Sequence, residues 1–189
     1  MRIVAGSFRG RILAAPRGSS TRPTADRTRQ AIFNVLEHAP WSAGLADRRV
    51  IDLFAGSGAL GLEALSRGAA DCLFIDRAPE ARAAIARNVE TLGVSSGASI
   101  EGGDAARLPP RPPSRDRFDL AFLDPPYGEG LGEAALAALE SGDWLEAGAL
   151  VVLERGAQEP ARGVPGFRLL DARRWGAANV QFLRRSADG

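Results

Sequence analysis

Four consecutive residues, Asp124, Pro125, Pro126 and Tyr127, carry the clearest chemical signal in this chain, and they directly follow the apolar run FDLAFL. The Asp124 carboxylate and the Pro125 carbonyl are hydrogen-bond acceptors, so each could take one N–H of an exocyclic amine on a nucleobase. The amine nitrogen would then point its lone pair at an electrophilic methyl group, and most of the catalysis would be positioning. The prolines stiffen the turn and remove competing N–H groups, while Tyr127 could stack on the base. We predict residues 124–127 as the catalytic group, the alternative being an ordinary strand-end turn.

A second signal is the glycine pattern GxGxxG, formed by Gly56, Gly58 and Gly61 in the segment DLFAGSGALG. The pattern follows a strand-like run and opens a helical one, which turns backbone N–H groups and a helix N-terminus toward a ligand. By itself it fits a nicotinamide dinucleotide as well as S-adenosylmethionine.

Acidic residues at three expected strand ends favour S-adenosylmethionine. Asp52, four residues before Gly56, would interact poorly with a pyrophosphate but well with the amino group of a methionine moiety. Asp76 could accept both ribose hydroxyls, and Asp104 could bind the adenine amine while the Ala105 N–H reaches a ring nitrogen. Asp52 and Asp104 could instead be carboxylates that only cap loops. The expected cofactor-binding set also contains three residues next to these positions or in the catalytic turn, Phe54, Arg77 and Asp124.

The elements that must position these residues alternate along the chain. Strands are predicted in RVIDLFAG, DCLFID, ASIEGGD, FDLAFLD and ALVVLER, and the helices between them in ALGLEALSRG, PEARAAIARNVETLG and GEAALAALESG. Helical crossovers of this length imply a parallel sheet covered on both faces. The last two segments, FRLLDARRW and ANVQFLRR, predict an antiparallel hairpin on the sheet edge. The fold class is therefore α/β and Rossmann-like.

Length and composition indicate one globular domain. The 189 residues are 45% hydrophobic and 25% charged, which is ordinary for such a domain. We expect a single domain over residues 1–189, with a basic N-terminal arm at 1–23, a first helix at 24–40 and a Rossmann-like core at 48–189. There is no long apolar run or leader, so we expect a cytoplasmic protein without a membrane span. One cysteine and one histidine leave no zinc cluster, and we expect no metal.

Basic charge is concentrated in the arm. Residues 1–30 contain seven arginines against Asp26 alone, whereas the whole chain has a net charge of only +1. Such an arm suits the phosphates of RNA. The expected RNA-binding residues are Arg9, Arg11, Arg22 and Arg27. The strand-like run RIVAGSFRGRIL favours an ordered ribbon over a disordered tail.

Together these segments resemble the RsmD-type family of 16S ribosomal RNA guanine-N2 methyltransferases. The resemblance covers MRIVAGSFRGR, RPTADRTRQAIFNVL, DLFAGSGALGLEALSRGA and FLDPPY, and so most of the chain. It implies a class I methyltransferase fold with a seven-stranded, mostly parallel sheet and S-adenosylmethionine as methyl donor. It also implies as acceptor a guanine of 16S rRNA, in an assembling or assembled small subunit. We expect the protein to act as a monomer.

Three rival functions are considered. An adenine-N6 methyltransferase would use the same catalytic turn, but one acting on DNA usually needs a recognition domain for which this chain has no room. A nicotinamide oxidoreductase would need a pair such as tyrosine and lysine, whereas Tyr127 is the only tyrosine and lysine is absent. A non-catalytic RNA-binding module would be expected to lack one of the strand-end acids, and all are present. The sequence context of five further residues indicates a structural role: His38, Cys72, Trp144, Glu154 and Trp175.

Overall fold

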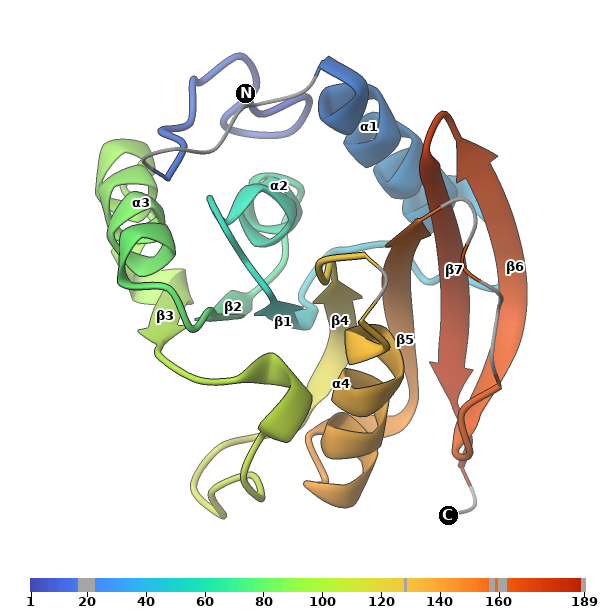
Figure 1. The fold of residues 1–189 in the computed structure, drawn as a ribbon. Helices are drawn as coiled ribbons and strands as arrows, with labels where there is room; N and C mark the ends of the chain where they lie inside the picture. Colours follow the sequence, from blue (N-terminus) through green and yellow to red (C-terminus); the bar gives the residue numbers. More distant parts are fainter. Residues whose placement is uncertain (17–22, 128, 157–158, 160–162, 188–189) are drawn as a thin grey trace.

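The computed structural model describes residues 1–16, 23–127, 129–156, 159 and 163–187. Its strands form one seven-stranded sheet in the order β3-β2-β1-β4-β5-β7-β6 (Figure 1). The strands are β1 (Arg49–Leu53), β2 (Asp71–Ile75), β3 (Ala98–Glu101), β4 (Phe118–Leu123), β5 (Leu145–Gly156), β6 (Phe167–Trp175) and β7 (Ala178–Arg185). The first five pair in parallel, and β7 is antiparallel to both β5 and β6. The predicted mostly parallel sheet with a C-terminal hairpin is confirmed.

Helices cover both faces of the sheet (Figure 1). One face carries α1 (Pro23–His38), α2 (Ala59–Ser66) and α3 (Pro79–Leu92), and the other carries α4 (Leu131–Ser141). Two short 3-10 turns, η1 (Ser95–Gly97) and η2 (Ala105–Arg107), flank β3. The first helix ends two residues before the predicted boundary, since Pro40 disfavours a helical conformation at the residue before it. Strand β5 is longer than ALVVLER, because Leu145 already pairs with Phe118 before a shift in register.

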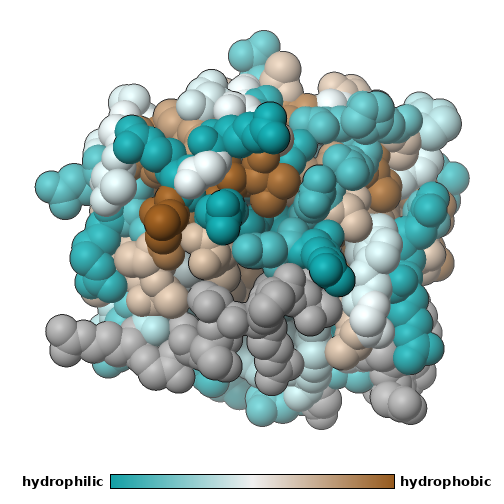
Figure 2. Space-filling view, turned by 90° about the horizontal axis from the view of Figure 1, so that it is seen from above, coloured by the Kyte–Doolittle hydropathy of each residue, from teal (hydrophilic) through white to brown (hydrophobic). Residues whose placement is uncertain are grey.

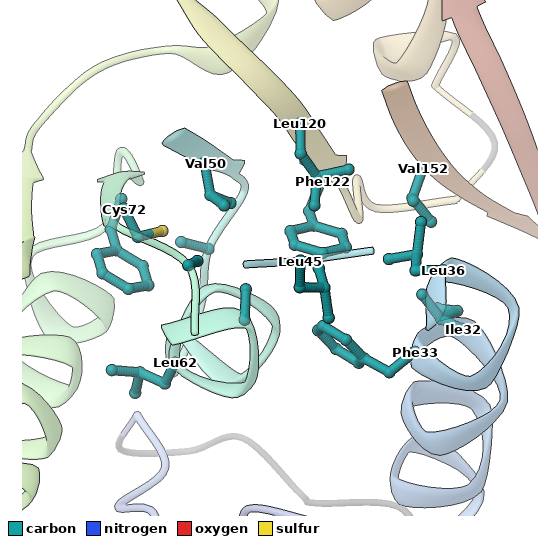
Figure 3. Close-up of a cluster of buried hydrophobic side chains, with 14 of the residues drawn as sticks. Ile32, Phe33, Leu36, Leu45, Val50, Leu62, Cys72, Leu120, Phe122 and Val152 are labelled. Carbon is teal, nitrogen blue, oxygen red and sulfur yellow. The ribbon is translucent and has the colours of Figure 1, made fainter. Parts of the chain in front are cut away.

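Side chains alternate between two buried clusters on the two faces of the sheet, as expected for parallel strands covered on both sides. Val50 of β1, Phe122 of β4 and Val152 of β5 belong to the cluster that contains Phe33 and Leu36 of α1 (Figure 3). Their chain neighbours Ile51, Leu123 and Leu153 pack into the second cluster, with Leu136 of α4. Because side chains are packed on both faces, each strand is held in position along its axis, and so is its carboxyl end.

The N-terminal segment is ordered over residues 1–16, as the ribbon prediction expected. Arg2 and Ile12 form an antiparallel bridge, and the flanking Ile3 and Leu13 are buried in the same cluster as α1. The buried Glu63 carboxylate of α2 accepts the N–H groups of residues 4 and 5 at 2.8 and 3.0 Å. The segment is therefore part of the core rather than a solvated tail. The predicted RNA contact Arg22 lies outside the described residues.

In the part of the chain that the structure describes, no helix has the length and apolar character needed to span a bilayer. The same residues contain no group of three or more histidine, cysteine, aspartate or glutamate side chains that could hold a metal ion.

Candidate active site

A cavity of about 730 Å³ lies at the carboxyl ends of the parallel strands. It opens where β1 and β4 are neighbours but the chain leaves them toward opposite sides of the sheet, the usual place for a ligand site in such folds. Five acidic residues line it: Asp52, Asp76, Asp104, Asp124 and Glu154. The carboxyl ends of the strands thus bring together acidic side chains that lie up to about a hundred residues apart in the sequence.

The loop between β1 and α2 forms one wall of the cavity. Phe54 has a left-handed backbone (φ 58°), a strained conformation for a residue with a side chain and one that occurs often at functional sites. Gly58, also predicted to bind cofactor, has a positive φ (76°) and directly precedes α2, but it is not among the residues that line the cavity. Gly61 allows close packing, because a Cβ there would lie 2.4 Å from the Phe74 ring. Gly56 lines the cavity, as predicted.

Asp52 is almost fully buried at the base of this wall. Its Oδ2 accepts the Gly61 N–H at 2.9 Å, so the carboxylate does cap the first turn of α2. Burial raises the pKa of Asp52 well above its usual value; the Gly61 hydrogen bond opposes this, and the nearby Asp124 and Asp76 add to it. Asp52 therefore supports the loop, and a cationic group placed beside it would favour its ionised form.

Asp76 connects the end of β2 to the glycine loop. Its two carboxylate oxygens accept the N–H groups of Gly56 and Ala78, each at 2.8 Å. Asp104 accepts the Ala106 N–H at 3.0 Å, which is the capping role considered as the alternative. The predicted residues Phe54, Asp76, Arg77, Asp104 and Ala105 all line the cavity.

The turn of residues 124–127 forms the opposite wall. The Asp124 side chain is accessible from the cavity, and no described residue donates a hydrogen bond to its carboxylate. It is nevertheless surrounded by protein, and this desolvation, together with the negative charge of Glu154, raises the pKa of Asp124 to about 7. Pro125 and Pro126 line the cavity beside it. The turn therefore offers acceptors that the fold leaves unused.

Tyr127 is held at the rim by β5. Its hydroxyl donates a hydrogen bond to Glu154 Oε1 at 2.7 Å. Its ring passes so close to Gly156 that a Cβ there would lie 3.3 Å from Tyr127 Cγ. The ring is half exposed, which leaves surface on which a planar ligand could stack.

Two charged side chains that line the cavity were missed by sequence reasoning. Glu154 was interpreted as structural, but it lines the cavity next to the catalytic turn. Its position at the carboxyl end of a predicted strand, like the other acids, was the signal that could have found it. Arg29 of α1 also lines the cavity, and its side chain is buried between the Arg2 carbonyl, Asp26 and Glu63. No local pattern identified Arg29 as a cavity residue, because only Asp26 among its partners lies on the same helix. The Arg2 carbonyl and Glu63 come from distant segments.

The charges of the cavity favour a cationic ligand. Five carboxylates face Arg77 and Arg29, and Arg29 already forms ion pairs with Asp26 and Glu63. A pyrophosphate would be repelled by such a lining, whereas a sulfonium and an ammonium group would be attracted.

A second hollow, of about 370 Å³, lies between the N-terminal segment and α1. Arg2, Arg9, Arg27 and Gln30 are among its lining residues, and Arg11 lies outside it. None of these four arginines forms an ion pair with a described residue. The hollow adjoins the first cavity, because Met1 and Arg29 line that cavity while their neighbours Arg2 and Asp26 line this one.

A family model, curated relatives and a solved structure all match this chain over most of its length. The model of a family described as conserved hypothetical protein 95 matches residues 1–184. Ribosomal RNA small subunit methyltransferase D of Escherichia coli is 35% identical, over 100% of this chain and 92% of its own. The Bacillus subtilis protein YlbH is 41% identical over 82% of each chain. The solved structure of the Escherichia coli protein yhhF has a TM-score of 0.83 and 30% identity, covering 100% of this chain and 99% of its own.

Proposed function

This chain belongs to the conserved hypothetical protein 95 family, that of the RsmD-type methyltransferases, and on this premise we propose its reaction. The reaction is transfer of a methyl group from S-adenosylmethionine to the exocyclic N2 amine of a guanine in 16S rRNA. The observation that carries the proposal is the Asp124 carboxylate, which lies in the cavity without a hydrogen-bond donor from the described residues. The substrate is an assembling or assembled small subunit, and the enzyme is a cytoplasmic monomer.

The cavity fits S-adenosylmethionine, which supplies the electrophilic methyl group when bound. The lining is acidic, and the cofactor carries a sulfonium and an ammonium group. In this proposal Asp52 attracts the ammonium group, Asp76 accepts the ribose hydroxyls, and Asp104 with the Ala105 N–H binds the adenine. Phe54, Gly56 and Arg77 complete the wall on that side.

The catalytic turn holds the acceptor base. Asp124 and the Pro125 carbonyl each accept one N–H of the target amine, which directs the nitrogen lone pair toward the cofactor side of the cavity. The base stacks on the exposed face of Tyr127, a contact worth about 1–3 kcal/mol. Because the pKa of Asp124 is about 7, its carboxylate can also accept the proton that the amine loses.

The arginines around the second hollow bind the RNA backbone. Arg2, Arg9, Arg11 and Arg27 have no ion-pair partner among the described residues, so their charges are available to phosphates. The hollow adjoins the cavity through Arg29. An RNA strand with phosphates in the hollow could therefore place an unstacked loop base in the cavity.

The test is transfer of labelled methyl from S-adenosylmethionine to small ribosomal subunits that lack the modification, followed by nucleoside analysis. Naked 16S RNA and duplex DNA serve as parallel substrates. Labelled N2-methylguanosine is the expected product, and label in N6-methyladenine would instead support the adenine alternative.

Two variants test the proposed base-binding and cofactor-binding parts of the site separately. Asp124→Ala should abolish turnover but leave the affinity for S-adenosylmethionine unchanged, because it removes an acceptor for the base. Asp76→Ala should chiefly weaken cofactor binding, measured by calorimetry. Turnover that persists in Asp124→Ala would contradict the mechanism.

A further inference from the structure

We propose that Glu154 determines the choice of guanine over adenine, by accepting the N1–H of the target base while Asp124 accepts from its N2 amine. The inference rests on the proposed function and deepens it. It assigns a specificity-determining role to a residue whose sequence context suggested only a structural one.

The sheet brings the two carboxylates together. Strands β4 and β5 are parallel, and their last paired residues include Phe122 with Val152 and Leu123 with Leu153. Asp124 and Glu154 come next on each strand, and neighbouring strands lie about 4.8 Å apart. Both residues line the same cavity, and they are close enough for the charge of Glu154 to affect Asp124.

The orientation of Glu154 is fixed by Tyr127. The tyrosine hydroxyl donates to Oε1 at 2.7 Å, which tethers the carboxylate at the edge of the ring on which the base stacks. A carboxylate has about four acceptor positions, so one hydrogen bond leaves capacity for a donor on the base. Glu154 is thus placed beside the base and able to accept from it.

The two purines present different edges to such a pair of acceptors. Guanine carries N1–H next to its 2-amino group, so two donors stand side by side. Adenine carries an acceptor nitrogen, N1, next to its 6-amino group. Asp124 and Pro125 could hold either amine, but a second carboxylate binds N1–H and repels the lone pair of adenine N1. In this arrangement Asp124 and Pro125 do not distinguish guanine from adenine, whereas Glu154 does.

The competing explanation is that Glu154 acts on the reaction only by holding Tyr127. Two substitutions distinguish the explanations. Glu154→Gln retains an oxygen that can accept from the Tyr127 hydroxyl but replaces the other oxygen with an N–H donor. Tyr127→Phe removes the hydroxyl and keeps the stacking ring.

The experiment compares two substrates that differ at N1: 16S RNA, naked or in subunits as the activity requires, with either guanine or 2-aminopurine at the target position. 2-Aminopurine keeps the 2-amine but has an acceptor at N1. It also lacks O6, and that difference is common to every variant, so it cancels when their preferences are compared. The measured quantity is kcat/KM on each substrate for the wild type and the two variants.

We expect Glu154→Gln to lower kcat/KM on guanine by about 10- to 100-fold, as for loss of a hydrogen bond to a charged group. It should lower kcat/KM on 2-aminopurine much less, so that the preference for guanine shrinks. Tyr127→Phe keeps the Glu154 carboxylate itself, so it should reduce the preference for guanine less than Glu154→Gln does. Unchanged affinity for S-adenosylmethionine shows that each variant is folded, and Glu154→Ala provides the same comparison if Glu154→Gln fails that check.

An equal loss on both substrates in Glu154→Gln would overturn the inference and leave Glu154 as a support for Tyr127. If the wild type methylates neither guanine-containing subunits nor guanine-containing RNA, the proposed function itself fails. The two failures are therefore distinguishable.

Discussion

At the scale of single residues, Asp124 combines accessibility with a raised pKa. Most carboxylates near a neighbouring arginine are held ionised, but Asp124 has protein around it and Glu154 beside it, so its neutral form is favoured up to about pH 7. A cationic cofactor in the cavity would favour ionisation again. The protonation state of Asp124 would thus depend on whether a cationic ligand occupies the cavity.

The raised pKa predicts a pH-dependent stability. In the unfolded chain an aspartate ionises near pH 4, whereas in the folded protein Asp124 ionises near pH 7. Its stabilising contribution is therefore fully present below about pH 4 and is lost as pH rises to about 7. Asp124→Asn should remove this dependence. The melting temperature of the variant minus that of the wild type should therefore be larger at pH 8 than at pH 5.

Thermal melting at the two pH values measures the effect, with the exposed Glu90→Gln as a control of equal charge change. A difference between Asp124→Asn and the wild type that does not vary with pH would contradict the assignment. The activity of the wild type should change in the opposite sense and rise with pH as the accepting carboxylate forms. Its midpoint should lie at or below about pH 7, because the cationic cofactor favours ionisation.

At the scale of elements, helix α2 connects the cavity wall formed by the β1–α2 loop to the N-terminal segment. Its first turn donates to Asp52 through Gly61, and its buried Glu63 and Ser66 bind the backbone of residues 4–8. Glu63 also forms a salt bridge with Arg67 at 2.7 Å. A displacement of this helix would therefore disturb the cavity and the arginine hollow together.

Gly61→Ala tests how tightly α2 packs on the sheet. Helix propensity alone favours alanine over glycine by about 1 kcal/mol. The added Cβ would, however, lie 2.4 Å from the Phe74 ring and 2.5 Å from Cys72 Sγ, both buried. We expect overpacking to prevail, with a net loss of about 1–2 kcal/mol in the free energy of unfolding and weaker cofactor binding.

Urea unfolding and calorimetric titration measure these two effects. Gly163→Ala is the matched control, because a Cβ at that position meets no atom of the described residues within 4 Å. A Gly61→Ala protein as stable as the wild type would show that β2 and α2 can separate without cost.

At the scale of the whole molecule, basic charge gathers beside an acidic cavity. The N-terminal segment and α1 carry the arginines, while the strand ends carry the carboxylates. Seen from above, the surface is mostly hydrophilic, with small hydrophobic areas between polar side chains (Figure 2). Because residues 1–16 bury Ile3 and Leu13 with α1, we infer that arm, helix and sheet fold as one domain.

Salt dependence tests the arginine hollow. Each phosphate contact on single-stranded RNA contributes about 0.7 to the slope of log affinity against log salt. Changing Arg2, Arg9 and Arg27 together to glutamine should reduce the magnitude of this slope by about 2, with cofactor affinity unchanged. RNA binding at several salt concentrations is the measurement.

A control triple variant removes the same charge elsewhere, at Arg87, Arg168 and Arg174, which are exposed and form no ion pair with a described residue. It should retain the wild-type slope. Equal effects of both triple variants would mean that RNA responds to net charge rather than to the hollow.

The sequence alone determined the elements and predicted most of the acidic residues that line the cavity. Alternation of apolar residues and glycine or proline boundaries are local properties, so the strands, the helices and the C-terminal hairpin could be predicted from them. Asp52, Asp76, Asp104 and Asp124 could be grouped in advance, because the carboxyl ends of parallel strands meet at one edge of a sheet.

Only the tertiary structure decided which neighbours these elements have. Local periodicity shows that a strand is buried but not which strand it pairs with. The insertion of β7 between β5 and β6 therefore followed from the fold alone. For the same reason Glu154 was missed: its position in the cavity depends on the register of β5 against β4 and on the Tyr127 hydroxyl. Arg29 reaches the cavity through partners 27 and 34 residues away. Such long-range contacts come from packing, and a local pattern does not contain them.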